Sequence, residues 1–157
     1  MPRPEDIARL VIALADPAAP EARYCLAEYF AELDRRFPGG FDPGPPADPA
    51  RYRPPLGAFL MATLDGQTLG CVALSIPDRE VKRLWIAPQA RGLGLARRLM
   101  AAIEDQARAM GLTDLRLDTN ATLTEAVTLY RRTGWVEIPR YNDNPYAQAW
   151  FGKLLTP

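Results

Sequence analysis

The stretch that decides the fold runs from Trp85 to Met100 and reads Trp-Ile-Ala-Pro-Gln-Ala-Arg-Gly-Leu-Gly-Leu-Ala-Arg-Arg-Leu-Met. It begins inside an apolar run typical of a strand and ends in a pattern of leucines and alanines at helical spacing. Between the two, Gly92 and Gly94 lack side chains, so that successive backbone N–H groups can approach an anion. The N-terminus of the following helix adds partial positive charge. The stretch therefore predicts a strand, an anion-binding loop and a helix.

This loop differs from two familiar phosphate-binding loops. Arg97 stands where the Rossmann pattern G-x-G-x-x-G has its third glycine, and the Gly-Lys-Ser/Thr of a Walker A loop is absent. Arg91, Arg97 and Arg98 add positive charge beside the glycines. Residues 81–132 hold nine Lys or Arg and five Asp or Glu, although the formal charge of the chain is zero. A solvated helix face would carry the same charges, but the distribution favours an anionic ligand over a nucleic acid.

The rest of the chain reads as short strands and amphipathic helices. Asp65-Gly66 marks a hairpin turn between two strands, and Pro20 begins a helix. Residues 9–15 are expected to form a strand, although a helix that begins near Pro4 competes with it. The strands are expected at 9–15, 58–64, 68–76, 80–86, 112–119, 135–138 and 147–155, and the helices at 20–37, 92–110 and 124–133. This order predicts a mixed α/β (α+β) fold.

Residues 38–55 contain seven of the sixteen prolines, which excludes regular structure there. A flexible linker is one interpretation of this segment. Phe41, Tyr52 and Leu56 are apolar residues that would anchor it to the body of the domain. Because long irregular loops inside compact domains are commonly functional, we expect an ordered loop beside a binding site.

Composition narrows the class of protein. A chain that is 48% hydrophobic and 24% charged fits one globular domain, residues 1–157. No apolar run approaches the ~20 residues of a membrane span, and the start lacks the pattern of a signal peptide, so we expect a cytoplasmic protein without a membrane partner. Histidine is absent, which excludes His-based triads and His-ligated metal, and no metal site is predicted. Cys25 and Cys71 form no CxxC motif and are expected in the core.

Two motifs resemble signatures of the GCN5-related N-acetyltransferase (GNAT) superfamily. Gln89-Ala-Arg-Gly-Leu-Gly94 matches its Q/R-x-x-G-x-G/A motif, and Pro88 precedes it at the usual place. Leu129-Tyr-Arg-Arg-Thr-Gly-Trp135 resembles its second motif, L-Y-x-x-x-G-[FW]. The resemblance covers about residues 58–155. It implies a single GNAT-like domain with a mixed, mostly antiparallel sheet that splays between the fourth and fifth strands and is flanked by helices.

The resemblance implies acetyl-CoA as the co-substrate. In the family the pyrophosphate binds the glycine loop, the pantetheine arm pairs with the edge of the fourth strand, and the thioester lies between the splayed strands. A backbone N–H from Ile86 would polarise the thioester carbonyl. The residues implied in cofactor binding are Trp85, Ile86, Ala87, Gln89, Arg91, Gly92, Leu93, Gly94, Leu95, Ala96 and Asn120. One departure is Leu123, which stands where many members carry an asparagine.

The same resemblance suggests catalytic residues. Tyr130 matches the family's usual general acid, which protonates the departing CoA thiolate, because a phenol is neutral at pH 7. A core tyrosine is the alternative. Glu80, at the start of the fourth strand, is the candidate general base, with acceptor binding or a structural pairing with Lys82 as alternatives. Asp118 and Asn120, at the end of the fifth strand, are weaker candidates for the base.

The segment from Tyr141 to Tyr146 joins the last two strands. The family places such a loop beside the acceptor, so Asn142, Asp143, Asn144 and Tyr146 are candidate substrate contacts, although Asn, Asp and Pro are also ordinary turn formers. Homodimers are frequent in the family, and a homodimer is one expectation here.

These observations predict an acyl-CoA-dependent N-acetyltransferase. It would move an acetyl group from acetyl-CoA to a primary amine of a small molecule or peptide by direct attack in a ternary complex. The alternative is a non-catalytic module that binds or senses acyl-CoA. Nucleic-acid binding is not expected, because the chain as a whole is uncharged.

Overall fold

The computed structural model describes residues 1–157, which form a seven-stranded sheet in the order β1-β2-β3-β4-β5-β7-β6. The strands are β1 (Val11–Leu14), β2 (Gly57–Leu64), β3 (Gln67–Ser75), β4 (Glu80–Ile86), β5 (Asp114–Thr119), β6 (Val136–Glu137) and β7 (Ala149–Leu154). Every neighbouring pair is antiparallel except β4 and β5, which are parallel. The mixed, mostly antiparallel sheet predicted from the sequence is confirmed.

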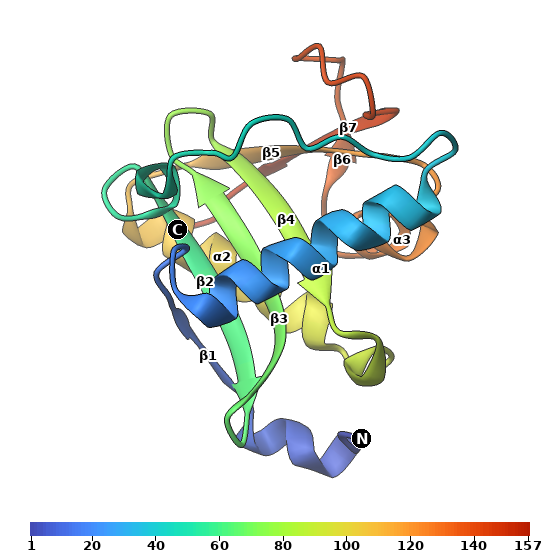
Figure 1. The fold of residues 1–157 in the computed structure, drawn as a ribbon. Coiled ribbons are helices and arrows are strands. Elements are labelled where there is room, and N and C mark those ends of the chain that lie inside the picture. The colour runs from blue at the N-terminus through green and yellow to red at the C-terminus, as the bar shows by residue number, and fades with distance from the viewer.

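Three α-helices flank the sheet (Figure 1): α1 (Pro20–Arg36), α2 (Leu95–Ala109) and α3 (Thr124–Arg132). α1 crosses one face of β2, β3 and β4, and α2 lies on the opposite face. α2 is amphipathic, and its buried residues are Leu95, Leu99, Met100, Ile103, Glu104 and Ala107. The helix ends before Gly111, whose φ of 93° lies in the left-handed region that glycine adopts readily.

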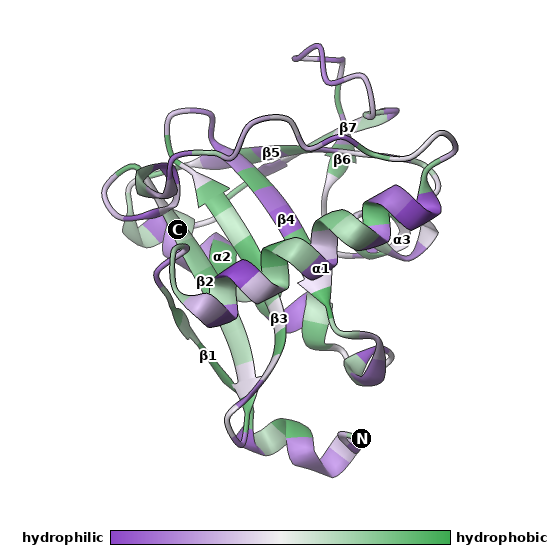
Figure 2. Cartoon of the chain, in the orientation of Figure 1, coloured by the Kyte–Doolittle hydropathy of each residue, from purple (hydrophilic) through white to green (hydrophobic).

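The core lies between the helices and the central strands. It forms one cluster of 29 buried residues, including Cys25 and Cys71, which are free thiols with no exposed surface. In Figure 2, β2 and β3 are mostly hydrophobic, whereas β4 carries a hydrophilic segment beside them. Polar residues in the middle of a sheet are costly to bury without partners. This part of β4 is therefore expected to border a pocket and not the hydrophobic core.

The site arises where β4 and β5 separate. Only one residue pair joins these strands, Glu80 with Arg116, at the start of β4. Beyond that pair the two strands have no further register, so the edges of both remain available toward Ile86 and Thr119. This is the predicted splay, and it opens a V in the middle of the sheet.

The N-terminal elements differ in detail from the prediction. A 3₁₀-helix, Pro4–Arg9, precedes β1, so the helix that begins at Pro4 and the strand both occur, one after the other. The glycine stretch 92–94 is not helical, and α2 begins at Leu95. No helix is long and apolar enough to cross a membrane.

The proline-rich segment lies against the body of the protein. Phe41 packs on Phe30 and Tyr146, with ring centroids 5.9 and 4.6 Å apart, and Tyr52 is buried in a short 3₁₀-helix, Pro49–Tyr52. These two anchors are confirmed. The third predicted anchor, Leu56, was wrong, because its side chain is 48% exposed and therefore lies outside the core.

Candidate active site

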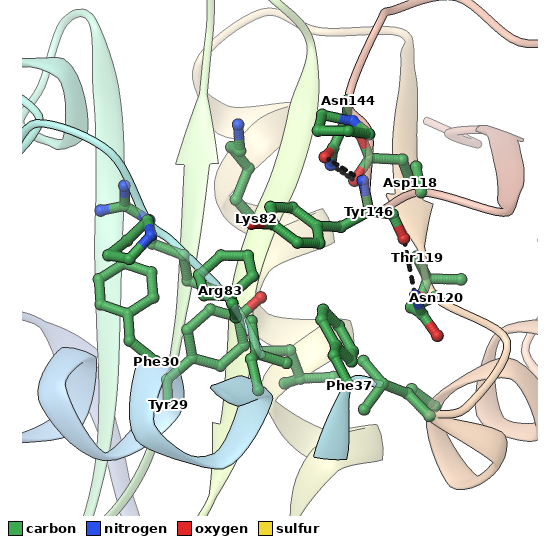
Figure 3. Close-up of a pocket in the computed structure, with 18 of the residues that line it drawn as sticks. Tyr29, Phe30, Phe37, Lys82, Arg83, Asp118, Thr119, Asn120, Asn144 and Tyr146 are labelled. Carbon is green, nitrogen blue, oxygen red and sulfur yellow. Dashed lines mark hydrogen bonds between the residues drawn. The ribbon is translucent and has the colours of Figure 1, made fainter. Parts of the chain in front are cut away.

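A pocket of about 420 Å³ occupies the V between β4 and β5 (Figure 3). Its walls come from segments far apart in the sequence. They come from α1, the proline-rich segment, β4, β5, α3 and the segment 144–147. The pocket is therefore a product of the splay, because it is bounded by both diverging strands.

A bulge in β4 shapes the floor of the pocket. The register of β3 and β4 shifts, so that Arg83 and Leu84 face Val72 alone. Arg83 has a φ of 61°, in the left-handed region that few non-glycine residues adopt. A bulge of this kind bends its strand and re-aims side chains, and both Arg83 and Leu84 line the pocket.

Tyr130 lines the pocket from α3. Its ring is buried against Trp135 and Phe151, with centroids 6.1 and 5.9 Å away. Burial, followed by the charges of Asp118 and Glu125, raises the pKa of Tyr130. The phenol therefore stays protonated at neutral pH, which is the state that a general acid requires.

Asp118 is the carboxylate that faces the pocket near the point where β5 ends. One of its oxygens accepts a hydrogen bond of 2.6 Å from the Asn142 amide, and the other accepts one of 3.3 Å from the Asn144 amide. Asn142 is held in turn by the Trp150 indole N–H at 3.0 Å. A carboxylate has about four acceptor sites, so Asp118 is fixed in place and can still receive an amine.

Glu80 lies at the closed end of the V and does not line the pocket. The residue is buried, accepts a hydrogen bond of 2.6 Å from the Tyr141 hydroxyl and contacts the Lys82 ammonium at 3.2 Å. Burial and the bond to Glu80 raise the pKa of Tyr141. Of the three roles considered for Glu80, these contacts favour the structural one.

The glycine loop presents free backbone donors. The N–H groups of Gly92, Leu93 and Gly94 donate to no group of the protein, and the two glycines have φ values of 80° and 78°. The Arg91 N–H is 3.4 Å from the Pro88 carbonyl oxygen. Leu95 and Ala96 follow as the first residues of α2, where N–H groups lack intrahelical acceptors. The loop thus suits the diphosphate of an acyl-CoA, because its donors converge with a helix N-terminus.

Two arginines flank this loop in different ways. Arg97 is exposed and makes no ion pair or hydrogen bond within the protein, so it is available to a phosphate. The Arg91 guanidinium is already engaged, because it donates to the Ile86 carbonyl at 3.0 Å and pairs with Glu32 of α1. Arg91 therefore ties the loop to α1, a contact that the sequence alone did not suggest.

At the end of β4, one edge of the strand pairs with β3 and the opposite edge faces the gap between β4 and β5. The Ala87 N–H donates to the Leu69 carbonyl of β3 at 2.9 Å, and alternate backbone amides of a strand point to opposite edges. The Ile86 N–H therefore faces β5, as the predicted cofactor contact requires. Trp85 is buried, with its ring in edge contact with Tyr24 at 6.2 Å, and Gln89 is half-buried in the 3₁₀-helix Pro88–Ala90.

The segment from Tyr141 to Tyr146 closes the pocket, and its residues differ in role. Asn144 and Tyr146 line the pocket, whereas Asp143 is exposed and lies outside it. The side chain of Asn120 holds this segment, because its amide donates to the Tyr146 carbonyl at 2.8 Å. Its oxygen accepts from the Thr122 N–H and hydroxyl, so the polar atoms of Asn120 are already used within the protein.

Sequence reasoning missed the aromatic wall and the bulge. Tyr29 and Phe30 of α1 line the pocket together with Phe37, which follows the helix, and so does Arg83. Aromatic residues at helical spacing are also the pattern of a core face, so the sequence carried no signal that separated pocket from core. The register shift that exposes Arg83 has no local sequence mark either.

Comparison with known proteins agrees with this geometry. The sequence matches the model of the Acetyltransferase (GNAT) family over residues 26–135. It is 36% identical over 114 residues to an uncharacterized N-acetyltransferase of Schizosaccharomyces pombe, a match that covers 69% of this chain and 70% of that protein. It is 41% identical over 83 residues to the IAA acetyltransferase of Azospirillum brasilense, covering 50% of this chain and 54% of that protein. The chain thus matches about half the length of the latter.

A solved structure shares the whole fold. A Klebsiella pneumoniae protein named as an acyl-CoA N-acyltransferase superimposes with a TM-score of 0.78 at 26% identity, over 95% of this chain and 99% of that one. The family match covers more than half of the chain and includes both the glycine loop and Tyr130. On the sequence match, the splayed sheet and the free amides of the loop, the chain is an acetyltransferase of the GNAT family.

Proposed function

We propose that this protein transfers an acetyl group from acetyl-CoA to a primary amine of a small molecule or peptide, by direct attack in a ternary complex. The observation that carries the proposal is the pocket in the V. It brings together a neutral phenol, Tyr130, and a fixed carboxylate, Asp118. The unpaired amides of the glycine loop lie on the segment that leads out of β4.

The loop and β4 would hold the co-substrate. The N–H groups of Gly92, Leu93 and Gly94 and the Arg97 guanidinium bind the diphosphate. The Ile86 N–H, which faces the V between β4 and β5, pairs with the pantetheine arm or polarises the thioester carbonyl. An acetyl thioester would supply an activated acyl group, and the backbone amides and side chains of this chain would do the rest.

Asp118 and Tyr130 would each move one proton of the reaction. Asp118 attracts the acceptor ammonium and takes one proton, which leaves a neutral amine. The amine nitrogen attacks the thioester carbonyl carbon, a C–N bond forms, and the C–S bond breaks. The nitrogen then loses its remaining extra proton to solvent, which leaves a neutral amide, and Asp118 releases to solvent the proton that it took. The departing sulfur takes the proton that the Tyr130 hydroxyl donates, and solvent reprotonates the phenol. Acid–base assistance of this kind commonly contributes about 10²–10⁴-fold in rate.

The experiment that tests the proposal separates an enzyme from a module that only binds acyl-CoA. Acetyl-CoA binding is measured by calorimetry, and CoA thiol release is followed in the presence of a panel of primary amines. Wild-type protein is expected to bind acetyl-CoA and to release CoA with at least one amine. Tyr130→Phe should bind acetyl-CoA as tightly as wild type while its kcat falls by about 10²-fold or more.

Two outcomes would contradict the proposal in different ways. If wild type binds acetyl-CoA but no amine accelerates thiol release, the binding module is favoured. If Tyr130→Phe retains the wild-type kcat, the phenol is a packing residue and the acid must be another group. Circular dichroism of both proteins checks that the substitution leaves the fold intact.

A further inference from the structure

Arg83 is a charged residue of the pocket that the mechanism above does not use. It lies on the bulge of β4, is half-buried and lines the pocket. Its guanidinium carbon lies 4.8 Å from the centroid of the Tyr52 ring and 5.3 Å from that of Phe30. Two aromatic rings therefore fix the cation without occupying its N–H donors, since stacking uses the face of the guanidinium.

The donors of Arg83 have no acceptor in the protein. The residue forms no ion pair and no side-chain hydrogen bond, although a guanidinium carries five N–H donors. The other arginines without such a partner are all exposed, and they are Arg23, Arg35, Arg97 and Arg132. Water satisfies an exposed arginine at little cost, whereas a half-buried one keeps unpaired donors at a greater cost.

No carboxylate of the pocket forms an ion pair with the Arg83 guanidinium. Only Asp42 and Asp118 among the lining residues are acidic. Asp42 accepts the Gly44 N–H at 2.8 Å, and Asp118 is held by two asparagine amides. The neighbouring cation, Lys82, pairs with Glu80, so Arg83 is the cation that remains for a ligand.

We propose that Arg83 binds the carboxylate of the acceptor, and that the acceptor is an amino acid or a similar amino carboxylate with an apolar side chain. This inference rests on the proposed acetyl transfer. Arg83 and Asp118 lie on opposite sides of the pocket in Figure 3. The carboxylate of such a molecule would therefore face the Arg83 guanidinium, and its ammonium would face the Asp118 carboxylate. In the same view the rings of Tyr29, Phe37 and Tyr146 lie between them and offer an apolar surface to its side chain.

The test compares acceptors that differ only in the carboxylate. Phenylalanine is paired with phenylalaninamide, and leucine with leucinamide, and CoA release is measured with each at saturating acetyl-CoA. For wild type, the kcat/KM is expected to be at least about tenfold higher with the free acid, because a charge-assisted guanidinium–carboxylate pair is stronger than a neutral hydrogen bond. Arg83→Met should lower kcat/KM for the acids by about 10- to 100-fold and leave the amides nearly unchanged.

The amide substrates also control for damage to the fold. Arg35→Met is the matched control variant, because Arg35 is an exposed, unpaired arginine of α1 outside the pocket, and it should behave as wild type with every substrate. The KM for acetyl-CoA should be the same in all three proteins. A loss of equal size for acids and amides in Arg83→Met would show a packing role, and a raised KM for acetyl-CoA would assign Arg83 to the co-substrate.

Either of those results overturns the inference, and so does equal use of acids and amides by wild type. The last result leaves acetyl transfer itself standing, since amides would still be acetylated. Absence of transfer to any amine, with Tyr130→Phe indistinguishable from wild type, removes the proposed function and this inference together.

Discussion

At the scale of single residues, position in the V separates two carboxylates that look alike in the sequence. Glu80 lies in the closed end, where Tyr141 and Lys82 occupy its oxygens. Asp118 lies in the open part and faces the pocket. The sequence makes Glu80 the main candidate for the base and Asp118 a weaker one, whereas our proposal assigns the base to Asp118 because of these contacts.

This difference gives a prediction for the two carboxylates. Asp118→Asn should lower kcat by about 10²-fold, because it removes the group that receives the amine proton. Glu80→Gln should change kcat much less and should instead lower the melting temperature, since a buried partner of Lys82 loses its charge, at a cost of about 1–3 kcal/mol. Steady-state rates and thermal unfolding of both variants check this. A larger fall in kcat for Glu80→Gln than for Asp118→Asn would identify Glu80, and not Asp118, as the general base.

At the scale of elements, the loop between β4 and α2 is an anion site made of backbone. Its donors are free because Gly92 and Gly94 hold left-handed φ values that break both the strand and the helix pattern. The helix that follows contributes further unpaired N–H groups. Affinity for a diphosphate therefore depends on open space above the glycines, and apart from the adjoining residues no atom lies within 4 Å of a Cβ built on either one.

The loop supports a prediction with a matched control. Gly92→Glu puts a carboxylate where the diphosphate would bind, so the Kd for acetyl-CoA should rise by at least about tenfold, which corresponds to ~1.4 kcal/mol. Gly111→Glu introduces the same residue at a similar φ, 93° against 80°, with equally open space, but at the far end of α2. It should leave the Kd unchanged. Calorimetry decides, and equal losses in both variants would point to strain in place of a lost anion site.

At the scale of the whole molecule, hydrogen-bonded carboxylates join distant segments. Arg36 of α1 pairs with Glu125 of α3 and also donates to the Thr122 carbonyl at 3.0 Å. Arg9 pairs with Asp65 at 2.9 Å, which links the N-terminal segment to the turn between β2 and β3. These contacts lie around the sheet rather than in its core, so they tie the periphery to a hydrophobic interior.

The same contacts predict how stability depends on pH. Hydrogen bonds hold four carboxyl pKa values below the ordinary 3.8 of Asp and 4.5 of Glu. The donors are the Arg3 backbone N–H for Asp6, the Ala18 backbone N–H for Asp16, the Arg9 guanidinium for Asp65 and the Arg36 guanidinium for Glu125. A lowered folded-state pKa means that the unfolded chain binds protons first, so this stabilisation is complete above those values and is lost as the pH falls through the lowered ones.

The melting temperature should therefore fall as the pH is reduced from about 5 toward 3. Glu125→Gln should begin lower at pH 7 and fall less over that interval, because one of the titrating groups is gone. Thermal unfolding followed by circular dichroism from pH 7 to pH 3 measures both slopes. Identical slopes would mean that the pairing of Glu125 with Arg36 contributes nothing to stability.

The sequence by itself determined the parts of this protein that depend on local chemistry. Gly92 and Gly94 before an amphipathic helix identify an anion loop, because backbone freedom and helix polarity are local properties. Alternating and helical apolar patterns gave the order of strands and helices within a few residues. The paired motifs around Gly94 and Tyr130 indicated the family that the match over residues 26–135 confirms.

Only the tertiary structure decided which polar side chains share the pocket. Arg83 faces it because a register shift between β3 and β4 bulges the strand, and Asp118 faces it because β5 diverges from β4. Asn142 and Asn144 reach Asp118 from a turn more than twenty residues later in the chain. In the sequence, Tyr29 and Phe30 of α1 have the spacing of core residues, but in the structure the splay of β4 and β5 leaves them beside the pocket. Such positions depend on strand pairing between distant segments, which no local pattern of residues records.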